Sequence, residues 1–491
     1  MRAHRINKKR KIFVEFSKIL FTIEQKGGTI LKIKKLKGNT KMKLLYQTHE
    51  RPTMGKNLIF ALQQLLAIIA ATVLVPVLVD PSATYLSQAS ALIGAGVGTL
   101  IYLALTKFRS PVFLGSSFAF IAPLCTGVMY GYCGVILGSI FAGSVYVIIA
   151  LLVKKFGTQW IAKLMPPVII GPTVALIGLS LSGSALNNVM NVAVSDKNYN
   201  LLYILVGIAT FLVTVIASTK GGKSLRMFPF VIGVLGGYVL ASLITVFGYH
   251  IGGVDYCKIV DFSVFATIGD FSNWLPNITI VGAIGELVGA KEMLLTGPGV
   301  LTILIAFAPV ALVTFAEHVA DHKNISTIIE RDLLEDPGLD RTLLGDGLGS
   351  IGGALMGGCP NTSYGESVGC VAITRNASIF TIMTTAILCI VLAFFYPVMA
   401  FIYSIPACIV GGISIALYGF IAVSGLRMFR HVDLDNTKNL YVVASIFVPG
   451  IGGLVLKFGD IQITSIACAL ILGILTNLML GKKAEANEDK Q

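Results

Sequence analysis

Two acidic residues stand in stretches of this chain that are otherwise uncharged. Glu366 lies in a polar, glycine-containing stretch, residues 360–369, and Glu317 directly follows an apolar run, residues 307–316. An ionised side chain at bilayer depth costs from about 2.5 to more than 10 kcal/mol, so such residues are rarely kept without a function. A carboxylate accepts N–H hydrogen bonds when ionised and donates one when protonated. The pair therefore indicates that a polar solute, and a proton, are handled inside a membrane.

The composition predicts a protein that crosses the bilayer many times. Of its 491 residues, 55% are hydrophobic and 13% are charged, with a mean hydropathy of +0.81, whereas soluble domains contain roughly 25% charged residues. Most of twelve apolar segments are near the roughly 20 residues that span a bilayer. These segments are Asn57–Val79, Ala83–Thr106, Gly134–Val153, Ile161–Leu181, Leu201–Ser218, Met227–Phe247, Val300–Ala320, Leu343–Met356, Ile379–Ala400, Pro406–Val423, Tyr441–Leu456 and Ile463–Leu480.

Two further segments, Val112–Met129 and Asn361–Thr374, are too polar and glycine-rich for ordinary spans. Both are flanked by apolar segments as if they were embedded in the membrane. Counting them, we expect an all-α polytopic membrane protein with fourteen transmembrane segments, of which segments 3 and 10 are short and broken.

Most of the net charge of +13 comes from the N-terminus. Residues 1–41 contain thirteen Lys or Arg and two Glu, so they contribute +11. Such a segment can bind nucleic acid or anionic lipid, but Lys and Arg interrupt every apolar stretch, which excludes a secretory signal. We expect residues 1–53 to form a disordered cytoplasmic leader without a function of its own, and Met42 is an alternative start.

The basic residues alternate between loops. Loops after even-numbered segments contain most of the Lys and Arg, whereas loops after odd-numbered segments are acidic or nearly neutral. The positive-inside rule then places both termini, including the tail at residues 482–491, in the cytoplasm. We expect a multi-pass protein of the bacterial cytoplasmic (inner) membrane.

The two halves of the chain are similar at a spacing near 240 residues. Met165–Pro172 resembles Ile405–Gly412, and each half has its broken segment in third place. Seven segments per repeat is an odd number, so the second half is inverted. Paired broken segments in inverted halves indicate a transporter's binding site, because irregular backbone at membrane depth requires polar partners or a water-filled cavity. The alternative is that the Gly and Ser residues only allow close helix packing.

Other polar residues accompany Glu317. Asp321 lies one helical turn further on the same face, and it has either a functional or a structural role. We expect His318 and His322 to be polar residues at headgroup level, and the charged residues 323–341 to form a solvated amphipathic loop. The structural alternative for Glu317 itself is an ion pair with a nearby His or Arg at the end of its helix.

Patterns typical of enzymes and metal sites are incomplete. The GxGxxG match at residues 347–352 has no βαβ unit around it, and His318 and His322 lack the HExxH order of zinc proteases. Asp346 follows a glycine, as in the GxGD motif of intramembrane aspartyl proteases, but Leu343 occupies the position of the first glycine of that motif. The eight scattered cysteines form no CxxC pair, which argues against zinc and disulfides. We expect no enzymatic activity, no metal and no cofactor.

Several motifs resemble the nucleobase–ascorbate transporter family, and its uracil permease branch in particular. The signature of that family is Gln, Glu or Pro, then Asn, any residue, Gly, four residues, Thr and Arg. Glu366-Ser367-Val368-Gly369 followed by Thr374-Arg375 fits it at all but one position. The resemblance covers essentially residues 54–481 and extends to Ala71–Pro76, Gly115–Phe120, Ala316–His318, Arg331–Leu334, Asp336–Leu339 and Pro360–Thr362.

The resemblance implies a seven-plus-seven inverted repeat with two domains. A core domain would comprise segments 1–4 and 8–11, residues 54–158 and 300–402. A gate domain would comprise segments 5–7 and 12–14, residues 159–299 and 403–481. Family members are often homodimers through the gate domain, so a homodimer is possible here.

The resemblance also implies a substrate and its contacts. Uracil would be imported by proton symport, with Glu317 and Glu366 accepting from its ring N–H groups and the backbone around Phe118 and Gly365 donating to its carbonyls. Tyr364 and Tyr418 match pocket-side positions, Ala71 would pack close to the base, and Phe118 would supply an apolar wall. Proton coupling would involve Glu317, Glu366 and Asp321. Sodium coupling, a xanthine or urate permease, an anion transporter of related architecture and a nucleobase sensor without transport are the alternatives.

Two residues depart from the family pattern. Ser367 replaces the usual Asn, which leaves open what holds Glu366 in place. Asp321 stands where some uracil permeases have His and purine permeases tend to have Asp, so it bears on both the choice of base and the proton path.

Overall fold

A computed structural model describes residues 44–157, 160, 166–190, 200–222, 225–276, 279–288, 297–430, 432–458 and 461–488. Most of the predicted leader, residues 1–43, and the nearly neutral loop with Asp196 and Lys197 lie outside these residues. The first described residues run beside residues 375–379, since Leu45 N donates to Arg375 O (2.7 Å) and Ala377 N donates to Tyr46 O (3.0 Å).

The described residues are mostly helical. Within the described ranges, eight helices are long and apolar enough to cross a membrane, and a ninth is added if one pair, bent by 76°, forms a single span. The helices are α2 (Met54–Val79), α3 (Gln88–Leu105), α5 (Gly131–Phe156), α7 with α8 (Pro167–Ser180, Ser182–Met190), α9 (Leu201–Thr219), α10 (Pro229–Ile244) with a π-helical extension (Thr245–Ile251), α12 (Gly297–Ile329), α17 (Ala407–Phe429), and the bent pair α15 and α16 (Ile379–Ala393, Tyr396–Tyr403). A helical, polytopic membrane protein is thereby confirmed.

The described chain has further helices and helical turns besides these. They are α4 (Ile121–Val128), α11 (Thr279–Val288), α13 (Leu339–Leu355), α14 (Gly365–Thr374), α18 (Thr437–Ile451) and α19 (Ser465–Glu488), with 3₁₀ turns at Phe118–Phe120, Leu225–Met227, Asp255–Cys257, Phe262–Gly269 and Phe271–Trp274 and a π turn at Leu334–Gly338. Local sequence sets several boundaries: Asn200 accepts from Leu202 N at the start of α9, and Pro229 occupies the first turn of α10, where its missing N–H is not needed.

The two broken segments meet as a small antiparallel sheet. Strand β1 (Leu114–Ser116) pairs with β2 (Asn361–Ser363), with Gly115 opposite Thr362. Each strand is soon followed by a short helix: β1 leads through a 3₁₀ turn into α4, and β2 into α14. This sheet, and a second one of β3 (Leu456–Phe458) with β4 (Ile461–Ile463), are exceptions to the predicted all-α fold.

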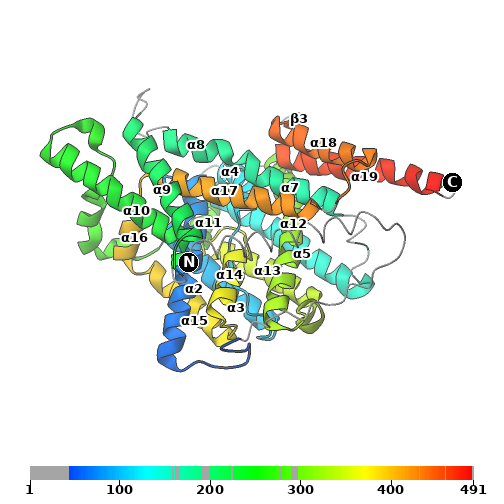
Figure 1. The fold of residues 1–491 in the computed structure, drawn as a ribbon, viewed down its shortest axis with the longest axis horizontal. Helices are drawn as coiled ribbons and strands as arrows, with labels where there is room; N and C mark the ends of the chain where they lie inside the picture. Colours follow the sequence, from blue (N-terminus) through cyan, green and yellow to red (C-terminus); the bar gives the residue numbers. More distant parts are fainter. Residues whose placement is uncertain are drawn as a thin grey trace, which may run out of the picture. The chain divides into compact units, whose positions relative to one another are not determined.

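The helices pack mostly in two groups (Figure 1). In one group, α3, α5, α13 and α15 pack closely together, with α2, α4, α12 and α14 beside them. In the other, α7 and α17 lie side by side, with α8, α9, α10, α18 and α19 around them. Contacts of α12 with α7 and α19 and of α2 with α10 join the groups, so a cavity between them can be lined by both.

Helix α12 is longer than the sequence analysis predicted. The apolar span was expected to end at Ala320, with a solvated loop over residues 323–341, but the helix continues to Ile329. The loop prediction is wrong for residues 323–329. Glu317 and Asp321 therefore lie inside a helix, not at its end, and their side chains are held in fixed directions.

Candidate functional site

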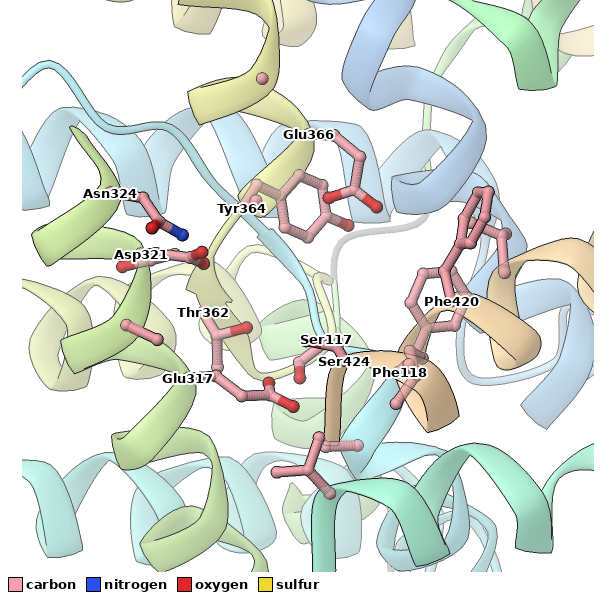
Figure 2. Close-up of a pocket in the computed structure, with 18 of the residues that line it drawn as sticks. Ser117, Phe118, Glu317, Asp321, Asn324, Thr362, Tyr364, Glu366, Phe420 and Ser424 are labelled. Atoms are coloured by element: carbon pink, nitrogen blue, oxygen red, sulfur yellow. The ribbon is translucent and has the colours of Figure 1, made fainter. Parts of the chain in front are cut away.

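A cavity of about 570 Å³ opens where the β1–β2 sheet, α12 and α17 meet. Figure 2 shows its wall: Glu317, Asp321 and Asn324 project from α12, Thr362 and Tyr364 lie on or beside β2, and Phe420 and Ser424 come from α17. The volume is in the range of roughly 300–1,000 Å³ that is usual for small-molecule sites.

The structure brings together most of the residues that the sequence analysis selected. Glu317, Glu366, Phe118, Gly365 and Tyr364 all line the cavity, and so does Asp321. These residues come from α12, from the turn after β1 and from the start of α14, which are distant in sequence. Their convergence supplies one wall with both acidic and apolar parts.

Two selected residues do not line the cavity. Ala71 is buried within α2. Tyr418 is also buried, its ring meets that of Phe118 edge-on with 6.2 Å between the centroids, and its hydroxyl has no hydrogen-bond partner within the described chain. Tyr418 thus supports the Phe118 ring from behind.

The start of α14 offers unpaired backbone donors to the cavity. Tyr364 caps this helix without a side-chain hydrogen bond, and Glu366 lies in its first turn. The first N–H groups of a helix have no partner within it and carry a partial positive charge. A Cβ atom at Gly365 would lie 3.5 Å from an Asp321 carboxylate oxygen, so α12 faces this helix start closely.

Three carboxylates lie around one cavity without partners. Within the described chain, Glu317, Asp321 and Glu366 form no hydrogen bond or ion pair with another residue. Glu317 and Glu366 are near enough to interact electrostatically. The predicted alternative for Glu317, an ion pair with a His or Arg, is wrong. Ionised carboxylates in one cavity repel each other, so the site favours a ligand with N–H donors or a bound proton.

Tyr364 joins the two broken segments. Its hydroxyl donates to Ser116 O (2.7 Å), and its ring lies where a side chain on Gly115 would have to be, only 2.4 Å from a Cβ atom built there. The side chain thereby fixes the distance between the end of β1 and the start of α14, which are the two backbone segments that face the cavity.

Gln64 provides the hydrogen bond that holds the start of α14 in place where Ser367 replaces the usual Asn. Gln64 Nε2 on α2 donates to Ser367 Oγ over 2.6 Å, and both side chains are buried. Because Ser367 directly follows Glu366, this hydrogen bond fastens the first turn of α14 to α2. The anchor that the departure from the family pattern left open is therefore present, with a different pair of residues.

The prediction that His318 and His322 lie at headgroup level is wrong, because both are buried, on a different face of α12 from Glu317 and Asp321. His318 Nδ1 lies 2.6 Å from Asp346 Oδ2, and His322 Nδ1 donates to His318 O (2.8 Å). Tyr102 OH lies 2.6 Å from His322 Nε2. The partners Asp346 and Tyr102 come from α13 and α3, so the sequence around α12 gave no sign of this network.

Part of the cavity wall was not predicted from the sequence. Asn324 continues the series Glu317, Asp321 along α12, and Phe420 and Ser424 follow Leu417 along α17. The spacing of three and four residues that places side chains on one helix face is a signal that could have found them. For α17 the cavity-facing side could not be chosen from an apolar sequence alone.

No group of three or more His, Cys, Asp or Glu able to hold a metal ion occurs in the described part of the chain.

Comparison with known proteins decides the family. Residues 55–457 match the model of a family described as "Permease family". The chain belongs to the nucleobase–ascorbate transporter family. Membership identifies it as a permease, a transport protein and not an enzyme.

Curated relatives cover nearly the whole permease. A protein named uracil permease from Bacillus caldolyticus is 39% identical over 446 residues, which are 90% of this chain and 95% of the relative. The uracil permease of Bacillus subtilis is 35% identical over 92% of this chain and 98% of the relative. That of Escherichia coli K12 is 34% identical over 88% and 92%.

Solved structures share the fold at low identity. The transmembrane domain of the cyanobacterial bicarbonate transporter BicA gives a TM-score of 0.57 at 13% identity, over 89% of this chain and all of that one. A structure of SLC26A9 also gives 0.57, at 9% identity, over 86% of this chain and 64% of that one. At such identities the likeness concerns the fold alone.

Proposed function

We propose that this permease imports uracil by proton symport. The observation that carries the proposal is the group of three partnerless carboxylates around a cavity that also contains a free helix start. Uracil has two ring N–H donors and two carbonyl acceptors, so it needs both kinds of partner. The names of the relatives, uracil permeases at 34–39% identity, support the same substrate.

The binding mode follows from the placement of donors and acceptors. Glu317 and Glu366 accept from the ring N–H groups, and backbone N–H groups near Phe118 and Gly365 donate to the carbonyls. The Phe118 and Phe420 rings form the apolar wall. Tyr364 fixes the two backbone segments, Ala71 packs close to them, and Tyr418 holds the Phe118 ring.

Proton coupling resides in the same carboxylates. Protonation of Glu317, Glu366 or Asp321 reduces the repulsion among them and favours occupation by the base. Deprotonation after the cavity opens to the cytoplasm then favours release. A sodium ion could neutralise the same charge, which is why the test below varies both ions.

The mechanism proposed for transport is movement of a core domain against a gate domain, within a seven-plus-seven inverted repeat of fourteen segments. The two packing groups of helices support this division. We place the protein in the bacterial inner membrane with both termini in the cytoplasm, as a homodimer through the gate domain.

The test is uptake of radiolabelled uracil into cells that lack their own uracil permease, with and without excess xanthine. We expect uptake that ignores xanthine, that depends on an inward proton gradient and that persists without sodium. Uptake blocked by xanthine would instead favour a purine permease, to which the Asp321 position points. Unchanged uptake by a Glu366→Ala protein would refute the proposed site.

A further inference from the structure

The cavity extends well beyond the space that a single-ring base fills. Its wall includes two helical series, and in the topology proposed above both helices end on the cytoplasmic side, so both series run toward the cytoplasm. On α12 the series is Glu317, Asp321 and Asn324, and on α17 it is Leu417, Phe420, Ser424 and Arg427. At 1.5 Å per residue, Leu417 to Arg427 covers about 15 Å.

The chemistry of the wall changes along this length. The inner end has the carboxylates and the aromatic rings. The middle has Asn324 and Ser424, which are neutral and hydrogen-bonding. The outer end has Arg427, in the last turn of α17, and Arg226, in the turn before α10. The cavity is thus acidic at one end and basic at the other.

The two arginines are available to a ligand. Both are exposed, and within the described chain neither forms an ion pair. Arg226 Nε donates to Gly221 O (2.7 Å), which orients the guanidinium and leaves its terminal nitrogens for other acceptors. Two guanidinium groups from separate elements around one opening are suited to a phosphate, which Arg can bind through two parallel hydrogen bonds.

We propose that this cavity also binds a pyrimidine nucleoside 5′-monophosphate, from the side on which the arginines lie. The base occupies the uracil site, the ribose hydroxyls meet Asn324 and Ser424, and the phosphate binds Arg226 and Arg427. The reverse orientation is disfavoured because it places the phosphate beside three carboxylates. The inference rests on the proposed function, since it uses the same base site.

The bound nucleotide would act as an inhibitor. It bridges the β1–β2 side of the cavity and the α10–α17 side, so it binds the open cavity and stabilises that state against closure. In the orientation proposed above, the arginines face the cytoplasm. A reaction that transfers ribose phosphate to the imported base would supply the ligand there, and uptake would fall as its product accumulates.

The experiment is competition for radiolabelled uracil on the purified, full-length protein, with uridine 5′-monophosphate, uridine and inorganic phosphate as competitors. We expect the monophosphate to compete better than uridine, and phosphate not to compete. Replacing both arginines, Arg226→Gln with Arg427→Gln, should weaken the monophosphate at least about tenfold, since charge-assisted hydrogen bonds contribute about 1.5–3 kcal/mol. Uracil affinity should be unchanged.

The control is Arg430→Gln, which removes the same charge from beyond the end of α17 but not from the cavity wall. The proposal is overturned if the monophosphate competes no better than uridine, if phosphate competes equally well, or if Arg430→Gln has the same effect. If the double Gln variant loses uracil binding, a double variant with Arg226→Lys and Arg427→Lys is used in its place. An unchanged affinity of that variant for the monophosphate would also contradict the proposal. A wild-type protein that binds no uracil contradicts the proposed function instead.

Discussion

Two faces of helix α12 differ in how their polar side chains are paired, although the residues on them are neighbours in the sequence. On one face, Glu317 and Asp321 line the cavity and have no partner in the described chain. On the other, His318 and His322 are buried against α3 and α13, where Asp346, Thr342 and Tyr102 satisfy their ring nitrogens. Buried polar groups are normally hydrogen-bonded, and the two histidines follow this rule, whereas the carboxylates are only half-buried and face the cavity.

The difference separates structural polar residues from functional ones. The His318–Asp346 pair is buried and hydrogen-bonded between α12 and α13, so its removal should affect folding. The carboxylates of the cavity lack such partners, and a ligand supplies them, so their removal should affect binding. Variants of adjacent residues can therefore test whether stability and binding are carried by separate faces.

The largest effect is expected for His318→Ala. It leaves the buried Asp346 carboxylate without its cationic or N–H partner, and loss of one member of a buried pair typically costs about 3–5 kcal/mol. We expect the free energy of unfolding to fall by about 3 kcal/mol, measured by denaturant-dependent labelling of the buried thiols Cys359 and Cys389.

Two further variants serve as controls for His318→Ala. Lys323→Ala, an exposed position on the same helix, should have little effect. The double variant with Asp346→Asn should recover part of the loss, because the unpaired charge is then gone. A His318→Ala protein that is as stable as wild type but cannot bind uracil would assign the network to transport and abolish the distinction between the faces.

The next effect concerns the neighbouring residue, in Glu317→Gln. The amide keeps the size of the side chain but removes the charged acceptor, which contributes about 1.5–3 kcal/mol to a hydrogen bond. We expect uracil affinity to fall roughly ten- to a hundredfold in an equilibrium binding assay, with stability unchanged. Glu335→Gln, exposed and outside the cavity, is the matched control. Lost stability with retained affinity would contradict the assignment.

The sequence predicted the cavity face of α12 better than the buried face. Glu317 and Asp321 are conspicuous as charges in an apolar segment, and their four-residue spacing gives their common direction. His318 and His322 were placed at headgroup level because the span was expected to end at Ala320. Their partners Asp346 and Tyr102 come from other helices, and such partners cannot be read from one segment.

For the two broken segments, too, the sequence predicted the positions but not the contacts between them. Their glycines and polar residues marked both positions, and the chain does form short strand–helix units there. The pairing of Gly115 with Thr362 joins residues far apart in the chain, and such pairing depends on the tertiary fold more than on local propensity. Tyr418 was predicted to line the cavity, but it contacts the Phe118 ring and does not line the cavity. The sequence does not distinguish a residue that lines a cavity from one that supports it.

A smaller effect is expected at the junction of the two regions, for Ser367→Ala. Gln64 then loses its acceptor while still buried, which costs about 1–3 kcal/mol, and Glu366 loses its anchor. We expect both uracil affinity and thermal stability to fall moderately. In a double-mutant cycle with Gln64→Leu, a coupling of at least about 0.5 kcal/mol is expected. Strictly additive losses would show that the 2.6 Å hydrogen bond contributes nothing.

The smallest effect is expected at Asp80, a carboxylate outside the spans that has all the donors the cavity carboxylates lack. Burial opposes its ionisation, but Tyr85 N (2.6 Å), Leu86 N (3.0 Å) and the Ser82 hydroxyl (2.8 Å) donate to it. Together these donors hold the pKa of Asp80 below its ordinary value of 3.8. Because the folded-state pKa is lowered, ionised Asp80 stabilises the fold above the ordinary value, and this stabilisation is lost as the pH falls through the folded-state pKa.

Asp80→Asn should therefore lower stability by roughly 1 kcal/mol near neutral pH, and its difference from wild type should shrink in acid. Unfolding measured as a function of pH, with Asp332→Asn as an exposed control, gives this profile. Uracil binding should be nearly unchanged, because Asp80 lies outside the cavity. If Asp80→Asn instead altered the pH dependence of uptake, a fully satisfied carboxylate would take part in coupling, and missing partners would no longer distinguish the functional carboxylates from the structural ones.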